Sequence, residues 1–374
     1  MKLFRRKFLK LTAGAAALPA LSRMAWAQAY PSRYVRLVVQ FPPGGASDPL
    51  ARVLANRLSE VWGQQVVVEN KGGAGGNIGA AAVAQSTPDG YTLLIGLDTS
   101  LTINPHVYPS LGYDPIADLA PVTRLCTFTN LMVVPNSSPA MSVMEFVNYA
   151  KQNRGKITFA SPGTGTSPHV SGELFKRITS IDMTHVPYRG GGPAYNDLIP
   201  GRVDVMFATM PSALAQVHSG VLRGLAATSA VRSPFAPNIP TVAESGVAGF
   251  DVSDGFGLYV PAKTPAEIVR KVRDDTVSAL AHPTVKQRLE EIAMTVMTST
   301  PSELAALLKS ETAKWGPAPA RARSEMPLIL LSSMGCRMCL RKDRRSKAKA
   351  HAPARGAAHE TTEQPKRKKT RRTG

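Results

Sequence analysis

Cysteine and aromatic residues are scarce in this 374-residue chain. It contains only 3 Cys, and Cys126 is the one that lies between residues 30 and 316. That stretch therefore cannot form an internal disulfide framework. Phe, Trp and Tyr make up 6% of the chain, which is too few to suggest an aromatic platform on which nucleic-acid bases stack.

Sequence motifs of several enzyme classes are missing as well. No G-x-S-x-G nucleophile elbow, G-x-x-x-x-G-K-[ST] phosphate loop or H-E-x-x-H zinc motif occurs. We therefore expect a protein that is not an enzyme and that holds no metal or cofactor. Near the C-terminus, Cys336 and Cys339 leave a zinc or redox role open as an alternative, although only His351 and His359 follow them as further ligands.

The positive charge of the chain is concentrated at its two ends. Six Lys or Arg and no acidic residue occur in residues 1–29, and sixteen Lys or Arg against four acidic residues occur in residues 317–374. These ends supply +18 of the formal net charge of +19, which leaves +1 for residues 30–316. We therefore expect no nucleic-acid binding by that central part.

The first 29 residues have the features of an export signal. A basic head precedes an apolar stretch of about a dozen residues, which is shorter than the roughly 20 residues of a transmembrane helix. Arg5-Arg6 followed by apolar residues matches the twin-arginine pattern, and Sec export is the alternative. Small residues allow cleavage after Ala27 or Ala29 equally well, so we expect a periplasmic protein that starts near Tyr30.

Residues 317–374 differ in character from the part that precedes them. They are rich in Lys, Arg, Ala and Pro and poor in residues that pack, a composition typical of disorder. One interpretation is a frameshift near residues 314–317. The other is a genuine basic arm, which could bind nucleic acid or an anionic membrane surface through residues 341–372.

Residues 30–316 alternate between strand-like and helix-like patterns. The runs at 34–41, 64–70 and 91–97 are strand-like, and the segments between them have helical spacing. A second series of the same kind begins near residue 131. This alternation predicts an α/β fold with largely parallel sheets, built as two similar βαβ lobes.

Several helices begin with sequences that suit an N-terminal cap. "TPAE" at residues 264–267 and "TPSE" at residues 300–303 both combine a Thr cap, a Pro in the first turn and a Glu at the third position. For the helix expected at residues 49–62, the predicted cap is Ser47 or Asp48.

Four glycine-rich turns each follow a strand-like run, at residues 44–45, 72–79, 163–165 and 190–192. Such turns lie at the carboxyl ends of strands, where open α/β sheets bind ligands, and N–H groups at the helix starts attract anions. The first, third and fourth turns therefore predict a ligand with one or more carboxylates. The second turn resembles the G-x-G-x-x-G motif of dinucleotide-binding sites, but its last glycine lies one residue too far along the chain. An exported oxidoreductase that binds a cofactor at residues 72–79 is therefore the alternative function.

Longer motifs show a resemblance to a known family. "FPPGGASDPLAR", "VVVENKGGAGGNIG", "SPGTGTSPHVSGELFK" and "HVPYRGGGPAYNDLIPGRVDVMF" occur in this order, and the chain resembles the Bug family of periplasmic receptors of tripartite tricarboxylate transporters over about residues 30–315. The resemblance implies a two-lobed periplasmic binding protein of type II, the Venus-flytrap fold with two Rossmann-like lobes joined by a hinge. It places lobe 1 at residues 30–128 plus 255–316 and lobe 2 at residues 129–254.

The resemblance also implies a function and a binding site. A monomeric receptor would capture a small mono-, di- or tricarboxylate between its lobes and deliver it to the integral membrane components of the transporter. The carboxylate would be held by the first glycine turn and by the loop before the first helix of lobe 2. Carried over to this sequence, the positions are Phe41, Pro42, Gly44, Gly45, Ser47, Asp48, Ser161, Gly163, Thr164, Gly165, Thr166 and His169.

The far side of the cleft departs from the family pattern. Ala208 and Thr209 stand where the family commonly has a polar pair, and Asp254 stands where it often has an aromatic residue. We therefore expect specificity to depend on Thr209, Asp254 and Tyr188 or Arg189. Arg189 either pairs with a second carboxylate or is a solvated loop residue.

Overall fold

The computed structural model describes residues 30–315, which belong to one compact unit and contain a ten-stranded sheet. The strands are β1 (Val35–Val39), β2 (Val66–Asn70), β3 (Thr92–Leu97), β4 (Leu119–Pro135), β5 (Thr158–Ser161), β6 (Thr184–Pro187), β7 (Val205–Thr209), β8 (Leu222–Ala227), β9 (Ser253–Pro261) and β10 (Thr295–Val296). The helices are α3 (Ser47–Trp62), the 3₁₀ turn η1 (Ala74–Gly76), α4 (Asn77–Ala84), α5 (Asp98–Val107), α6 (Val143–Gln152), α7 (Ser167–Thr179), α8 (Gly191–Leu198), α9 (Met210–His218), α10 (Ala266–Ala281), α11 (Pro283–Glu291) and α12 (Pro301–Trp315).

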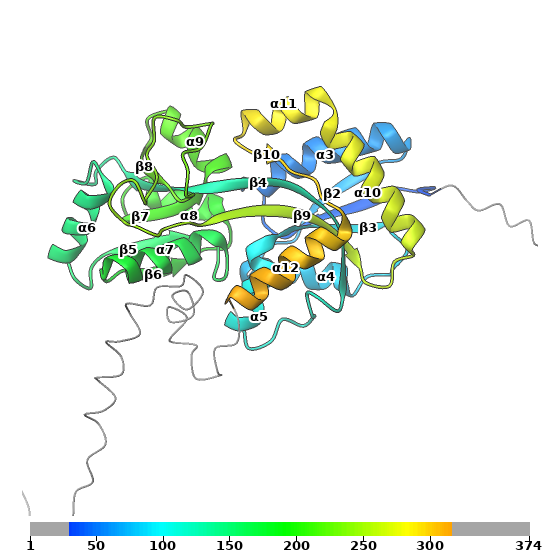
Figure 1. Cartoon of the computed structure of the whole chain (residues 1–374), viewed down its shortest axis with the longest axis horizontal. Coiled ribbons are helices and arrows are strands. Elements are labelled where there is room, and N and C mark those ends of the chain that lie inside the picture. Colours follow the sequence, from blue (N-terminus) through cyan, green and yellow to red (C-terminus); the bar gives the residue numbers. More distant parts are fainter. Residues whose placement is uncertain (1–29, 316–374) are drawn as a thin grey trace, which may run out of the picture. The chain divides into compact units, whose positions relative to one another are not determined.

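The sheet has the order β2-β1-β3-β9-β4-β7-β5-β6, with β8 and β10 also paired to β4. The pairs formed by β1 with β2 and β3, and by β5 with β6 and β7, are parallel, as the alternating pattern predicts. The pairs that β4 and β9 form are antiparallel. Figure 1 shows β4 and β9 passing between the two groups of helices and strands, so the chain crosses between its lobes on these two strands.

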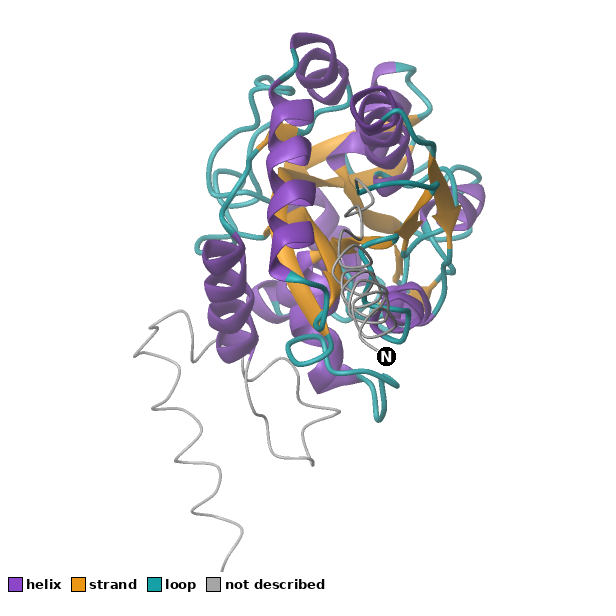
Figure 2. Cartoon of the chain, turned by 90° about the vertical axis from the view of Figure 1, so that its right-hand side faces the viewer, coloured by secondary structure: helices purple, strands orange, loops and turns teal. Residues whose placement is uncertain are grey.

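Lobe 1 packs helices on both sides of its strands. Alternate residues of β1 point to opposite faces, so Leu37 lies in a core with Leu54 of α3, whereas Val38 lies in a second core with Leu304 of α12. Helix α10 lies against α3, and α12 lies against α5 and β4. The end-on view in Figure 2 shows the strands inside and helices around them. The last two predicted helices therefore pack back on lobe 1, as the sequence suggests.

Lobe 2 repeats this layered arrangement. One core lies between the strands and helices α6 and α7, and includes Phe146, Phe159, Phe175 and Phe207. A second core lies on the other side, beneath α8 and α9. The two-lobed α/β fold expected from the sequence is thus confirmed, while the boundaries at residues 128/129 and 254/255 stay a prediction.

The crossing strands are joined by one buried threonine. The backbone N–H of Thr228 donates to the carbonyl of Asn130 in β4 (2.9 Å), and its hydroxyl accepts from the Asn130 N–H (3.0 Å). The same hydroxyl donates to the carbonyl of Val252, the residue before β9 (2.7 Å). Thr228 is fully buried, so it holds both strands where they pass from one lobe to the other.

Helix capping agrees with the sequence at one of the predicted sites and differs at two. At residues 300–303, the Thr300 hydroxyl accepts from the Glu303 N–H and the Glu303 carboxylate accepts from the Thr300 N–H. The Thr264 hydroxyl instead donates to the Pro261 carbonyl, because helix α10 begins later than the motif suggests. Helix α3 has no side-chain cap either, so the prediction that Ser47 or Asp48 caps it was wrong.

None of the helices within residues 30–315 combines the length and apolarity needed to cross a membrane. The predicted export signal and the basic C-terminal segment both lie outside the described residues.

Replacing the strand-joining threonine should weaken the fold. Thr228→Val keeps the shape of the side chain but removes the hydroxyl from a fully buried site. Because this leaves the Asn130 N–H and the Val252 carbonyl without that partner, we expect the free energy of unfolding in urea to fall by about 1–3 kcal/mol. Thr184→Val, at an exposed position of β6, is the control and should change it little; equal effects of the two substitutions would contradict the assigned role.

Candidate ligand-binding site

A small cavity of about 40 Å³ lies where the glycine turns of the two lobes meet. It is lined by Phe41, Gly45, Ala46, Ser47, Leu97, Pro162, Thr166, Pro168, Gly191, Met206, Thr209, Ser212 and Phe256. Five of the predicted ligand-binding residues are among these: Phe41, Gly45, Ser47, Thr166 and Thr209. Gly191 belongs to the fourth glycine turn, whereas nothing in the sequence pattern singles out Ser212.

The lobe 1 wall is formed by the end of β1 and the start of α3. Ser47 is the first residue of α3 and is 1% exposed, and its hydroxyl has no hydrogen-bond partner. A buried hydroxyl without a partner is unfavourable, so this atom is available to a ligand in the cavity. Asp48 does not line the cavity; its carboxylate pairs with Arg52 on the next turn (2.9 Å).

The lobe 2 wall is formed by the starts of three helices. Thr166 precedes α7, Gly191 is the first residue of α8, and Thr209 precedes α9. Because α3 starts at the cavity too, the N-termini of four helices meet there. The first N–H groups of a helix have no partner within it and carry partial positive charge.

The cavity is electrostatically suited to an anion without being cationic. Its lining includes no Lys, Arg, His, Asp or Glu. Four helix N-termini attract negative charge and offer N–H donors, and the Ser47 hydroxyl adds a donor from a side chain. A carboxylate fits this arrangement, in agreement with the nearly neutral charge of residues 30–316.

Backbone atoms of the two lobes come into direct contact through the glycine turns. A methyl group on Gly75 would collide with the carbonyl oxygen of Thr164, and one on Gly190 would collide with the ring of Pro42. The Tyr108 hydroxyl donates to the same Thr164 carbonyl (3.1 Å). Glycine is therefore required in these turns by the close approach of the opposite lobe.

The same packing accounts for the turn at residues 72–79. A side chain at Gly76 would collide with Gln40, and one at Gly79 would lie 2.8 Å from the Gln40 Cα atom. The turn thus packs against β1 and against lobe 2. This contact explains its glycines without a dinucleotide.

The loop at residues 161–169 encloses buried side chains. Ser161, which is fully buried, lies 2.7 Å from Nε2 of His185, and Nδ1 of His169 accepts from the Gly165 N–H (3.2 Å). Burial lowers the pKa of His169 to about 4 and that of His185 to about 3. Both imidazoles are neutral at pH 7 and support the shape of the loop.

The other predicted site residues lie around the cavity without lining it. Pro42 and Gly163 make the interlobe contacts, and Gly44 is exposed. The Tyr188 hydroxyl donates to Asp197 (2.8 Å). Arg189 is exposed, which agrees with the solvated alternative.

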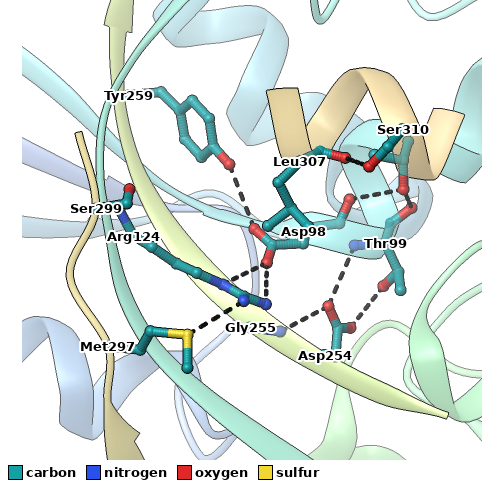
Figure 3. A network of polar contacts seen from close by, with 11 residues as sticks. Asp98, Thr99, Arg124, Asp254, Gly255, Tyr259, Met297, Ser299, Leu307 and Ser310 are labelled. Carbon is teal, nitrogen blue, oxygen red and sulfur yellow. Dashed lines mark hydrogen bonds and ion pairs between the residues drawn. The ribbon is translucent and has the colours of Figure 1, made fainter. Parts of the chain in front are cut away.

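Asp254 lies in a different cavity, of about 340 Å³, beside α12 (Figure 3). Its carboxylate accepts from the hydroxyl (2.6 Å) and N–H (3.2 Å) of Thr99 and from the N–H of Gly255 (2.8 Å). Nearby, Arg124 donates to Asp98 (2.8 Å), which is almost fully buried. Because four carboxylates and one arginine line this cavity, it is unsuited to a carboxylate ligand.

Comparison with known proteins decides the family. Residues 50–321 match the family described as tripartite tricarboxylate transporter family receptor. The chain belongs to this family. BugT of Bordetella pertussis is 34% identical over 290 residues, which cover 77% of this chain and 89% of BugT. The resemblance to the Bug family is thereby confirmed.

Solved structures with similar sequences share the fold. Rpa4515 of R. palustris, solved with adipate, is 35% identical with a TM-score of 0.75, covering 79% of this chain and 98% of that one. BugD is 34% identical with a TM-score of 0.74 over 76% of this chain and 96% of its own. MatC of Rhodopseudomonas palustris, solved with malate, is 32% identical with a TM-score of 0.73, covering 76% of this chain and 98% of MatC.

The buried carboxylate of Asp254 should make the stability of this receptor depend on pH. Burial, with a contribution from Asp98, raises the pKa of Asp254 to about 7, whereas in the unfolded chain an Asp has a pKa of about 3.9. The folded state therefore holds the proton more tightly, and its stability falls as the pH rises from about 4 to 7.

Asp254→Asn should remove this contribution. We expect the free energy of unfolding of the wild type to fall, relative to that of the variant, as the pH is raised from 4 to 7 in a series of urea titrations. Asp182→Asn, at an exposed position, serves as the control. Parallel curves for the wild type and Asp254→Asn would show that Asp254 is ionised throughout.

Proposed function

We propose that this receptor binds a small carboxylate in the cavity between its lobes and delivers it to the membrane components of a tripartite tricarboxylate transporter. The observation that carries the proposal is the buried, unpartnered hydroxyl of Ser47 at a cavity where four helix N-termini meet. Ser47 and the adjacent N–H groups would hold the carboxylate.

The ligands of related receptors support this choice. Adipate and malate, named with two of the similar structures, are both small carboxylates. In this chain, Phe41, Gly45 and Ser47 would contact the ligand from lobe 1, and Thr166 and Thr209 from lobe 2. Asp48 and the residues of the 161–169 loop would act by holding these positions in place.

Ligand binding would favour the closed arrangement of the lobes. Residues of both lobes line the cavity, so a ligand makes its full set of contacts only when the lobes are together. A ligand shifts a conformational equilibrium by its difference in affinity for the two states. The transporter would then recognise the closed form.

The receptor would act in the periplasm, as a monomer and without catalysing a reaction. Receptors of this family are periplasmic, and the sequence begins with the features of an export signal. The Ser161 hydroxyl is fully buried and is therefore inaccessible as a nucleophile. The close packing of residues 72–79 likewise favours a receptor over a cofactor-binding oxidoreductase.

A thermal-shift panel of carboxylates on the purified full chain tests this function. A ligand present at 100 times its dissociation constant stabilises a folded protein by about 2.7 kcal/mol. We expect at least one small carboxylate to raise the melting temperature, while matched alcohols and amines leave it unchanged. The absence of a shift with every carboxylate would overturn the proposed ligand class.

Gly45→Val should abolish this stabilisation and leave a folded protein. Gly45 lines the cavity, and a Cβ atom there would have only the Pro42 carbonyl oxygen near it, at 3.9 Å. The valine would therefore occupy ligand space without straining the backbone. Ala266→Val, at an exposed position of α10, is the control, measured by melting temperature with and without the carboxylate; normal binding by Gly45→Val would place the ligand elsewhere.

A further inference from the structure

Apolar side chains make up a large part of the lining of the interlobe cavity. Phe41 and Leu97 come from lobe 1 strand ends, Phe256 comes from β9, and Met206 comes from β7 of lobe 2. All four are at most 8% exposed. The remaining hydrocarbon surface comes from Ala46, Pro162 and Pro168.

The hydroxyl groups of lobe 2 at this cavity are already engaged. The Thr166 hydroxyl donates to the Gly163 carbonyl (2.7 Å). Those of Thr209 and Ser212 are 2.9 Å apart, and Ser212 is also bonded to the Thr209 carbonyl and the Tyr195 hydroxyl. Among the side chains that line the cavity, the Ser47 hydroxyl is the buried polar group left without a partner.

The single unpartnered hydroxyl makes the two ends of a ligand unequal. One carboxylate can bind the Ser47 hydroxyl together with N–H groups of the helix starts, whereas a second carboxylate buried in the same cavity would find no further unpartnered side-chain donor among the lining residues. Burying a charged group without a partner is strongly unfavourable, and no cationic side chain lines the cavity to compensate. A methyl or other apolar group in the same place would instead be stabilised by burial.

We propose that the ligand of this receptor is a small monocarboxylate whose remaining atoms are apolar. The inference rests on the proposed function and narrows it, because it concerns the same cavity. It sets this chain apart from the receptors solved with adipate and malate, which are dicarboxylates. The 40 Å³ cavity is several times the roughly 10–15 Å³ that one water needs in this measure, which suits a short chain.

Butanoate and succinate provide a direct test, because they have the same number of carbons and differ by one carboxylate. Isothermal titration of the full chain with each acid should show butanoate binding at least about tenfold more tightly. Equal or tighter binding of succinate would overturn the monocarboxylate assignment and leave carboxylate binding intact. Binding of neither these two nor any other acid of the thermal-shift panel would instead overturn the proposed function, and with it this inference.

Substitution of the apolar wall adds a second test. Met206→Gln places an amide at the wall with little change of shape, so it should lower the butanoate-to-succinate affinity ratio severalfold, and Met141→Gln, at a position 63% exposed, is the matched control. An unchanged ratio in Met206→Gln would contradict the role of the wall. Ser47→Ala should weaken both acids by a similar factor, since both place a carboxylate at Ser47; a loss confined to one acid would contradict the assigned orientation.

Discussion

The candidate binding site depends on direct contact between the backbones of two loops from opposite lobes. Gly75 lies against the carbonyl of Thr164, and a methyl group on Gly163 would lie 3.2 Å from the Cα atom of Gly75. Side chains at these positions would hold the lobes apart. Because the loops meet without side chains between them, the lobes come close enough for the starts of α3, α7, α8 and α9 to enclose one small cavity.

The same constraint explains how a nearly neutral protein can offer the proposed site for an anion. A cationic side chain would need space, and its long stem would separate the lobes. Backbone N–H groups need none, and four helix N-termini supply them together with partial positive charge. The Ser47 hydroxyl adds a donor at the start of α3. The proposed recognition by backbone groups therefore follows from the close contact between the lobes.

The architecture and the glycine turns could be predicted from the sequence because each produces a recognisable pattern of neighbouring residues. Strands with alternating or continuous apolar residues, and turns that need glycine, are visible without tertiary information. The length of β4, 17 residues, was not foreseen, because only residues 131–135 at its end form a continuous apolar run. The partner of Asp48 was also missed: a carboxylate at a helix start suggests a cap, but Arg52 one turn later competes for it.

Residues far apart in the sequence were the hardest to place. Asp254 seemed to belong to the ligand cleft, yet it bonds Thr99 at the start of α5. Nothing in the local pattern of either residue reveals this pairing, because it depends on how β9 passes beside α5. The same holds for Met206 and Phe256, whose apolar side chains reach the cavity from strands that also build the cores.

Helix α5 connects the crossing strands to the site. Its start is tied to β9 through Asp254, and the residue before it, Leu97, lines the cavity. Farther along, Asn104 donates to the Gly75 carbonyl (3.2 Å), and Tyr108, just after the helix, donates to Thr164 of lobe 2. A shift of β9 would therefore act on the cavity wall and on the interlobe contact through helix α5. The buried Asp254 carboxylate thus ties β9 to the start of α5, next to the candidate site.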